Sequence, residues 1–174
     1  MADVIEPAAT GRATCRRCQE KIEKGVLRFG ERVPNAFGEG EATYWFHLPC
    51  AAEKVPDRLR AALDAFAGEV AERAALDRVI AEGVDNPALV MVKQAERAPT
   101  GRARCQECHE KIEKDALRVA LERDAEVASM AQTSYVHARC AAAHVGGAGL
   151  LSKLRRTSPG LGAEDLAELA QALA

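Results

Sequence analysis

Cys15-Arg16-Arg17-Cys18, followed after 28 residues by His47-Leu48-Pro49-Cys50, is the stretch that decides the fold of this chain. The pattern returns as Cys105-Gln106-Glu107-Cys108 and His137-Ala138-Arg139-Cys140, again with 28 residues between its two parts. Each cysteine and histidine of the first set recurs 90 positions later, and all six cysteines are used. This period divides the 174 residues into two similar units.

Three cysteines and one histidine are the ligand set of a closed, tetrahedral zinc site. Sulfur ligands disfavour magnesium and calcium, and a fourth protein ligand leaves no open position for a catalytic water. Buried cysteines or disulfides are the alternative, but they predict neither the repeated spacing nor the matched histidines. We therefore expect two structural Zn²⁺ ions per chain, with the ligands Cys15, Cys18, His47, Cys50, Cys105, Cys108, His137 and Cys140.

The period predicts two domains, residues 1–87 and 88–174, each too small to bury a large core and therefore dependent on its metal. We expect an α+β fold in which each module has a short antiparallel sheet, a zinc site and C-terminal helices. The turn-forming residues 83–87 predict the boundary, with residues 88–99 as the connection. Residues 1–9 are expected to form a flexible tail.

Apolar periodicity places the elements within each unit. Strands are expected at 26–29 and 43–46 in the first unit, and at 116–119 and 133–136 in the second, with variable loops at 34–40 and 124–130 between them. A helical region begins at Pro56, with Gly68 as a point of kinking or division, and shorter helices are expected at about 148–156 and 163–173. Ile22 and Ile112 are expected to cover the metals, and Trp45 and Tyr135 to pack beside them.

Charge and composition limit the function. The chain has 24 Lys or Arg, 26 Asp or Glu and a formal charge of −2, so any site for an anion must be local. The N-terminus does not resemble a signal peptide, and no apolar run approaches the ~18 residues of a membrane span. We expect a cytoplasmic, nucleoid-associated protein that binds no membrane. His109 and His144 have no counterpart at the 90-residue offset and are expected at the surface.

The residues around the ligands resemble the PARP-type zinc finger, the DNA-break-sensing module of poly(ADP-ribose) polymerase and of a DNA ligase. The shared features are Gly-Arg-Ala before the first knuckle cysteine, Lys-Ile-x-Lys and Leu-Arg after the knuckle, an aromatic pair before His-x-x-Cys, and a helical tail. They cover most of both halves. No nucleophile with its base, phosphate loop or carboxylate pair stands out, so we expect a protein that is not an enzyme.

The resemblance implies a set of DNA contacts. The arginine before the knuckle and the arginine of Leu-Arg would bind backbone phosphates, which assigns Arg12, Arg28, Arg102 and Arg118 to that role. A planar guanidinium suits phosphate, although salt bridges to neighbouring glutamates are the alternative. An apolar loop would stack on the base pair exposed at a break. Phe37 is its counterpart in the first unit, and Val127 and Met130 are weaker counterparts in the second.

Two functions follow from these observations. The first is a zinc-dependent DNA-binding protein for nicks, ends or distorted duplexes in DNA repair or the damage response, recognising structure rather than base sequence. The second is a protein-interaction scaffold in which the acidic balance matters and the helical tails bind a protein partner.

Overall fold

The computed structural model describes residues 2–35, 38–122 and 133–174. The chain divides into two compact units, Met1–Asp85 and Asn86–Ala174, so the division falls two residues before the expected boundary. Each unit has a three-stranded antiparallel sheet and helices that follow it, which confirms the α+β fold. Among the described helices, none is both long and apolar enough to cross a lipid bilayer.

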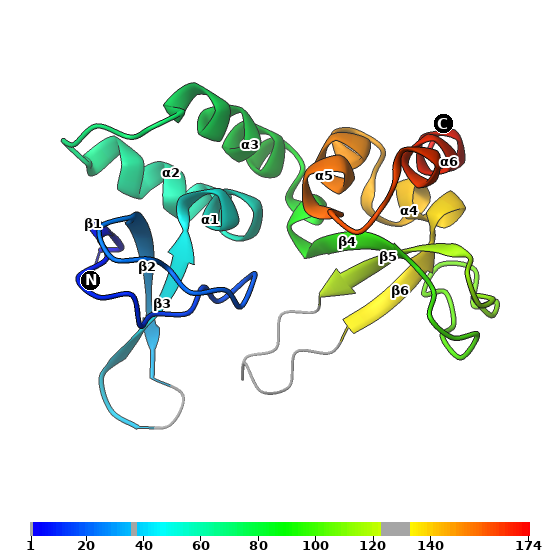
Figure 1. Cartoon of the computed structure of the whole chain (residues 1–174), viewed down its shortest axis with the longest axis horizontal. Helices are drawn as coiled ribbons and strands as arrows, with labels where there is room; N and C mark the ends of the chain where they lie inside the picture. The colour runs from blue at the N-terminus through cyan, green and yellow to red at the C-terminus, as the bar shows by residue number, and fades with distance from the viewer. Residues whose placement is uncertain (1, 36–37, 123–132) are drawn as a thin grey trace. The chain divides into compact units, whose positions relative to one another are not determined.

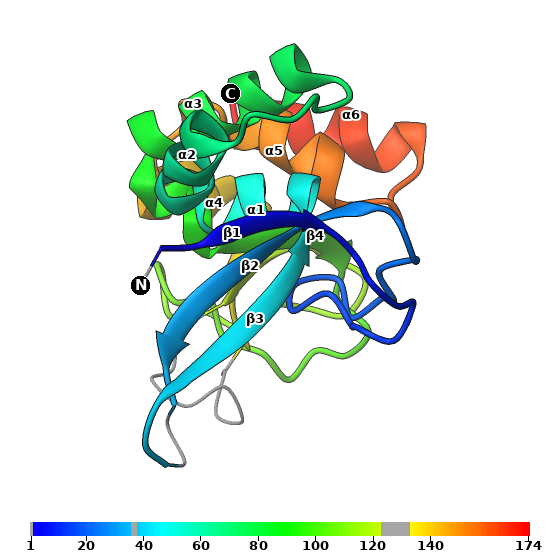
Figure 2. The ribbon, with the colours of Figure 1, turned by 90° about the vertical axis from the view of Figure 1, so that its left-hand side faces the viewer.

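The first unit begins with the sheet. Its strands are β1 (Val4–Pro7), β2 (Leu27–Pro34) and β3 (Glu41–His47), in the order β1-β2-β3 (Figure 1). Helices α1 (Leu48–Lys54), α2 (Pro56–Ala65) and α3 (Arg73–Asp85) follow. Figure 2 shows all three helices on the same side of the sheet. The long helical region predicted from Pro56 is divided near Gly68, as expected.

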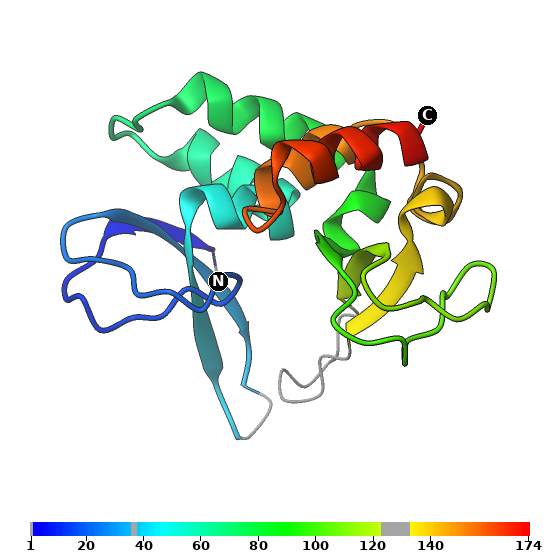
Figure 3. The same cartoon turned by 45° about the vertical axis from the view of Figure 1, so that its right-hand side comes forward.

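The second unit repeats this order. A short 3₁₀ helix, η1 (Pro87–Met91), leads into β4 (Val92–Arg97), β5 (Leu117–Glu122) and β6 (Thr133–His137), in the order β4-β5-β6. Helices α4 (Ala138–Val145), α5 (Leu150–Thr157) and α6 (Ala163–Ala172) follow, and α5 packs on β4 while α4 packs on β5 and β6. In Figure 3 the orange and red helices of this unit are α5 and α6.

The first strand of each sheet was not expected from the sequence. Residues predicted as a flexible tail form β1, and residues predicted as a connection form η1 and β4, so both predictions are wrong. Ile5 pairs with Phe29, and Ala95 pairs with Val119. Both strands are short, with four residues in β1 and six in β4, so neither carries a clear apolar alternation of its own. They acquire their structure by hydrogen bonding to a longer or equally long central strand.

Each unit has a separate hydrophobic core. In the first unit Phe29 and Phe46 lie at its centre with Leu59 and Ile80, and in the second Val119 and Val136 lie with Leu150 and Leu154; all eight side chains are at most 2% exposed. Ile22 belongs to the same buried cluster as Cys15, and Ile112 to that of Cys105. The packing of each metal-binding loop is therefore continuous with the core of its own unit.

In each unit an arginine forms ion pairs that link a helix to the sheet. Arg58 of α2 donates to Asp3 and, at 2.6 Å, to Glu31, whereas Arg97 of β4 donates to Asp165, at 2.9 Å from its Nε, and to Glu168 on α6. Burial raises the pKa of Glu31 above its ordinary value, and this rise outweighs the nearby guanidinium of Arg58. The helices predicted to pack on their own fingers are thus also held there by ion pairs.

Candidate metal centres

The first metal centre draws its ligands from three elements. Cys15 and Cys18 come from the loop between β1 and β2, His47 ends β3, and Cys50 lies in the first turn of α1. Their ligand atoms all lie within 4.8 Å of one another. The Nδ1 atom of His47 is 3.5 Å from the Cys18 sulfur and 3.9 Å from the Cys50 sulfur. The four side chains therefore converge on one point.

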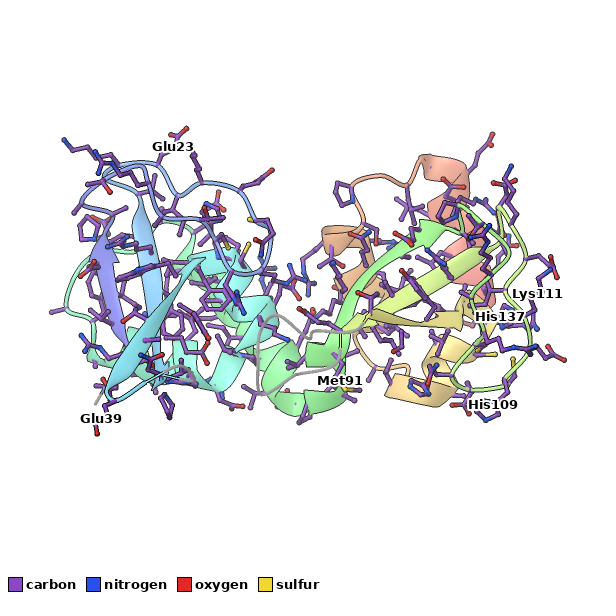
Figure 4. All side chains as sticks on the ribbon, turned by 90° about the horizontal axis from the view of Figure 1, so that it is seen from below. Glu23, Glu39, Met91, His109, Lys111 and His137 are labelled. Carbon is purple, nitrogen blue, oxygen red and sulfur yellow. The ribbon has the colours of Figure 1, made fainter. Side chains whose placement is uncertain are left out.

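The second centre has the same construction from Cys105, Cys108, His137 and Cys140, again with all ligand atoms within 4.8 Å. The Nδ1 atom of His137 is 3.4 Å from the Cys108 sulfur, and its Nε2 atom is 3.2 Å from the backbone oxygen of Lys111. Because a carbonyl only accepts, Nε2 carries the proton and leaves the lone pair of Nδ1 for a metal. Figure 4 labels His137 and Lys111 next to each other in the second unit. His137 is buried and Lys111 is exposed.

These distances fit zinc. Tetrahedral Zn²⁺ with bonds of about 2.3 Å to sulfur and 2.0 to 2.1 Å to nitrogen places neighbouring sulfur and nitrogen ligands about 3.5 Å apart. All six cysteines are free thiols, and three sulfurs in each cluster could not all pair as disulfides. Two Cys₃His sites suited to zinc are therefore present, as the sequence predicted. Four protein ligands close each site, so its metal is structural.

The thiols of each cluster have opposing pKa shifts. A hydrogen bond from Cys50 lowers the pKa of Cys15 to about 4, and the same interaction raises the pKa of Cys50 above its ordinary value. Burial acts to raise the pKa of Cys105, but backbone N–H groups outweigh it and lower the pKa to about 6, whereas burial raises that of Cys140 to about 11. One thiolate thus opposes ionisation of its neighbours, and a divalent cation removes this penalty.

A backbone turn shapes each Cys-x-x-Cys knuckle. The residue after the second cysteine is left-handed, with φ of 64° at Gln19 and 60° at His109, and its N–H donates to the oxygen of the first cysteine. Within the turn, Arg16 donates its N–H to the Trp45 oxygen at 2.8 Å, and Gln106 donates to the Tyr135 oxygen at 2.9 Å. The knuckle is thereby attached to the strand that carries the histidine ligand.

A row of three side chains crosses each sheet next to the metal. Antiparallel pairing places Glu6 opposite Arg28 and Arg28 opposite His47, and it places Glu96, Arg118 and His137 in the same relation. Residues that face each other across paired strands project on the same side of a sheet. In each unit the arginine therefore lies between an acidic partner and a metal ligand.

Both arginines of these rows are held on two sides. The Nη2 atom of Arg28 is 2.6 Å from Glu6, and its guanidinium carbon is 3.4 Å from the centre of the Trp45 ring. Arg118 donates to Glu96 at 2.9 Å from Nε and lies 3.6 Å from the centre of the Tyr135 ring. Arg28 is only 8% exposed and Arg118 only 5%. The aromatic residues expected beside the zinc thus support an arginine.

The other predicted DNA-binding residues have different surroundings. Arg12 and Arg102 are exposed on the metal-binding loops. Phe37, Val127 and Met130 lie outside the described residues. The partners of Arg28 and Arg118 are Glu6 and Glu96, not glutamates of the metal-binding loop. Whether Arg28 and Arg118 contact phosphate stays a prediction.

Glu6 and Glu96, the partners of the two row arginines, were not singled out by sequence reasoning. A signal for them exists, because the 90-residue offset extends upstream of the knuckles to this pair and to Ala8 and Ala98, which are 2% and 0% exposed. Of the two histidines expected at the surface, His109 is exposed (Figure 4), whereas His144 is partly buried and lies 2.8 Å from Glu107.

Comparison with known proteins agrees with this geometry. Residues 6–78 match the family described as Poly(ADP-ribose) polymerase and DNA-Ligase Zn-finger region. The chain is 30% identical over 138 residues to a poly [ADP-ribose] polymerase of Sarcophaga peregrina, and 28% identical over 128 residues to poly [ADP-ribose] polymerase 1 of Danio rerio. Each match covers 66% of this chain, more than one unit, and 13% of the relative.

Fold, ligand set and matches together define a zinc-finger module of the Cys₃His class. Residues 6–78 are a PARP-type zinc finger. The second unit repeats the ligand set, knuckle turn and strand register of the first at an offset of 90 residues. Four protein ligands fill each site, which gives its metal a structural and not a catalytic role.

Proposed function

We propose that this chain is a non-enzymatic, zinc-dependent DNA-binding protein that recognises strand breaks or duplex ends in DNA repair or the damage response. The observation that carries the proposal is a closed zinc centre of the PARP type beside an exposed, arginine-bearing loop. A rigid, metal-held backbone fixes the positions of charged side chains and so suits recognition of phosphate geometry.

Phosphate contacts would come first from Arg12 and Arg102, which are exposed and equivalent in the two units. Arg28 and Arg118, on the central strand of each sheet, add phosphate contacts only through N–H donors that Glu6 and Glu96 do not occupy. Phe37 would stack on the base pair exposed at a break, with Val127 and Met130 in the corresponding part of the second unit. Such contacts read structure, not base sequence.

The test is binding of the full chain to three duplexes of equal length and sequence: covalently closed, nicked, and blunt-ended. We expect tighter binding to the nicked and blunt-ended forms at matched salt. Stacking of a base on an aromatic side chain contributes about 1 to 3 kcal/mol. Phe37→Ala should therefore remove much of a tenfold to hundredfold preference and preserve the phosphate contacts.

The outcomes separate DNA recognition from a scaffold function. Equal affinity for closed and nicked DNA would contradict break recognition but retain DNA binding. Lack of binding to all three duplexes at low salt would contradict the DNA-binding proposal and favour a protein-interaction scaffold, with the helical tails as the partner surface. Zinc content of two per chain in every preparation is the control for folding.

A further inference from the structure

The first knuckle carries two adjacent arginines between its ligands, and one of them is held against an aromatic ring. The guanidinium carbon of Arg16 lies 4.6 Å from the centre of the Tyr44 ring. Arg16 is exposed and Tyr44 is half-buried, so the ring is a fixed support for a side chain that reaches solvent. The backbone of Arg16 is fixed as well, through its bond to Trp45 of β3.

A guanidinium stacked on a ring keeps its in-plane N–H donors available. A planar fork of donors matches two oxygens of a phosphate, and prior stacking reduces the side-chain entropy that binding would otherwise cost. Within the described part of the chain, neither Arg17 nor Arg12 forms an ion pair, and the same holds for Lys21 and Lys24. The first metal-binding loop therefore presents cations that internal carboxylates do not neutralise.

The equivalent positions of the second unit lack this arrangement. Gln106 and Glu107 replace the two arginines, and Ser134 stands at the position of Tyr44. Glu107 pairs with His144 of α4, at 2.8 Å. Two cations of the same region are also paired internally: Lys111 with Glu113 at 3.2 Å and Arg139 with Glu110 at 2.9 Å. The charged side chains around the second knuckle therefore pair with residues of their own unit.

The local charges differ accordingly. Residues 10–25 contain five Lys or Arg and two Glu, whereas residues 100–115 contain four Lys or Arg and four Asp or Glu. Three thiolates on Zn²⁺ add one negative charge to each loop. The first loop then has a net charge of +2 and the second of −1. A surface with excess cations attracts a polyanion, and a surface with excess carboxylate repels it.

We propose that the first knuckle is a phosphate clamp, in which Arg16 is pre-positioned by Tyr44 and acts with Arg17 on the phosphodiester backbone of DNA. The second knuckle makes no comparable contact, so the two fingers bind DNA unequally. This proposal rests on the DNA-binding function proposed above. It adds residues outside the metal ligands and the arginines before each knuckle, and it assigns backbone binding chiefly to the first unit.

The experiment replaces the first knuckle by the sequence of the second within the full chain. Arg16→Gln with Arg17→Glu gives the first knuckle the sequence of the second, and Gln106→Ala with Glu107→Ala is the matched control in the second unit. Affinity for a nicked duplex is measured by fluorescence anisotropy over a series of salt concentrations. Each phosphate contact contributes about 0.9 to the log-log salt slope, so loss of two contacts should reduce its magnitude by about 1.8.

We expect the first variant to weaken binding about tenfold or more at 0.1 M salt, while the control retains the affinity of the unsubstituted chain or exceeds it. Tyr44→Phe should retain affinity because the ring stays under Arg16. Tyr44→Ser should weaken binding in the unsubstituted chain and have no further effect in the Arg16→Gln background. Zinc analysis confirms that each variant still binds two ions.

An unchanged salt slope in the Arg16→Gln, Arg17→Glu variant, in a chain that binds DNA, overturns the clamp and leaves the proposed function intact. An equal loss of affinity in the control of the second unit overturns the asymmetry. Failure of the unsubstituted chain to bind any duplex overturns the proposed function and the clamp together.

Discussion

The two units keep the same row of glutamate, arginine and histidine across their sheets but differ beside it. In the first unit Gly30 lies opposite Trp45, and in the second Ala120 lies opposite Tyr135. A Cβ atom on Gly30 would lie 2.7 Å from Cζ3 of Trp45, so the larger ring requires the smaller residue. The two units therefore share the metal ligands and the row beside them. They differ in the size of the aromatic ring and in the charge of the knuckle.

The largest expected effect is loss of one zinc. Structural zinc contributes about 10 to 16 kcal/mol to a small finger, comparable to the whole stability of a domain, about 5 to 15 kcal/mol. Cys18→Ser should unfold the first unit and Cys108→Ser the second, because the two cores are separate clusters. Elemental analysis should find one zinc in each variant, and amide resonances of the other unit should persist. Simultaneous loss of both units from either variant would contradict this independence.

Removal of the row arginine comes next. Arg118→Ala leaves Glu96 without its cationic partner and Tyr135 without its stacked neighbour, so we expect a loss of about 2 to 3 kcal/mol in the second unit. Arg28→Ala should cost less, about 1 to 2 kcal/mol, because Glu6 is 39% exposed and solvent screens the pair.

Urea unfolding checks this order, with the single tryptophan reporting on the first unit and amide exchange on the second. Zinc content should stay at two in both variants. A larger loss for Arg28→Ala than for Arg118→Ala would reverse the inferred difference between the units. DNA binding by the same two variants is informative only in the absence of urea and only where both units remain folded.

Exchange of the small residue under the ring should have an intermediate effect. Gly30→Ala places a methyl group against Trp45 and Val4, and such overpacking costs about 1 to 3 kcal/mol. Gly30→Ala with Trp45→Tyr reproduces the pair of the second unit and should recover about 1 kcal/mol or more relative to additivity. Ala120→Gly, which removes a buried methyl group, is the reciprocal control. Strict additivity in the double-mutant cycle would show that the ring does not set the size of its neighbour.

The smallest effect concerns the turn before the central strand. Gly25 and Asp115 occupy equivalent positions with φ of 84° and 64°. Gly25→Ala should cost about 1 kcal/mol because a Cβ disfavours the left-handed region, although no atom lies within 4 Å to clash with it. Asp115→Gly should change stability by less than about 0.5 kcal/mol because aspartate tolerates this conformation. Thermal unfolding of both variants measures the difference.

Several parts of the molecule could be predicted because they are local patterns. The ligand spacing identified both metal centres, and the apolar pattern placed the helices α5 and α6 within two residues at either end. It placed the start of each central strand within one residue, but β2 continues to Pro34 and β5 to Glu122, beyond the predicted ends at 29 and 119. These signals are strong because zinc fixes ligand type and count, and because a buried face repeats with the period of its element. The first strands carry no such signal, and only pairing with β2 and β5 gives them structure.

The sequence by itself determined the metal, its eight ligands, the division into two repeats and the family of the first finger, since each depends on residue identity at fixed spacing. Only the tertiary structure decided the surroundings of the arginines. Strand register buries Arg28 and Arg118 between a carboxylate and a ring, whereas Arg16 stacks on Tyr44 and remains exposed. The sequence does not distinguish a buried, ion-paired arginine from an exposed one, because burial and charge pairing depend on strands that are distant along the chain.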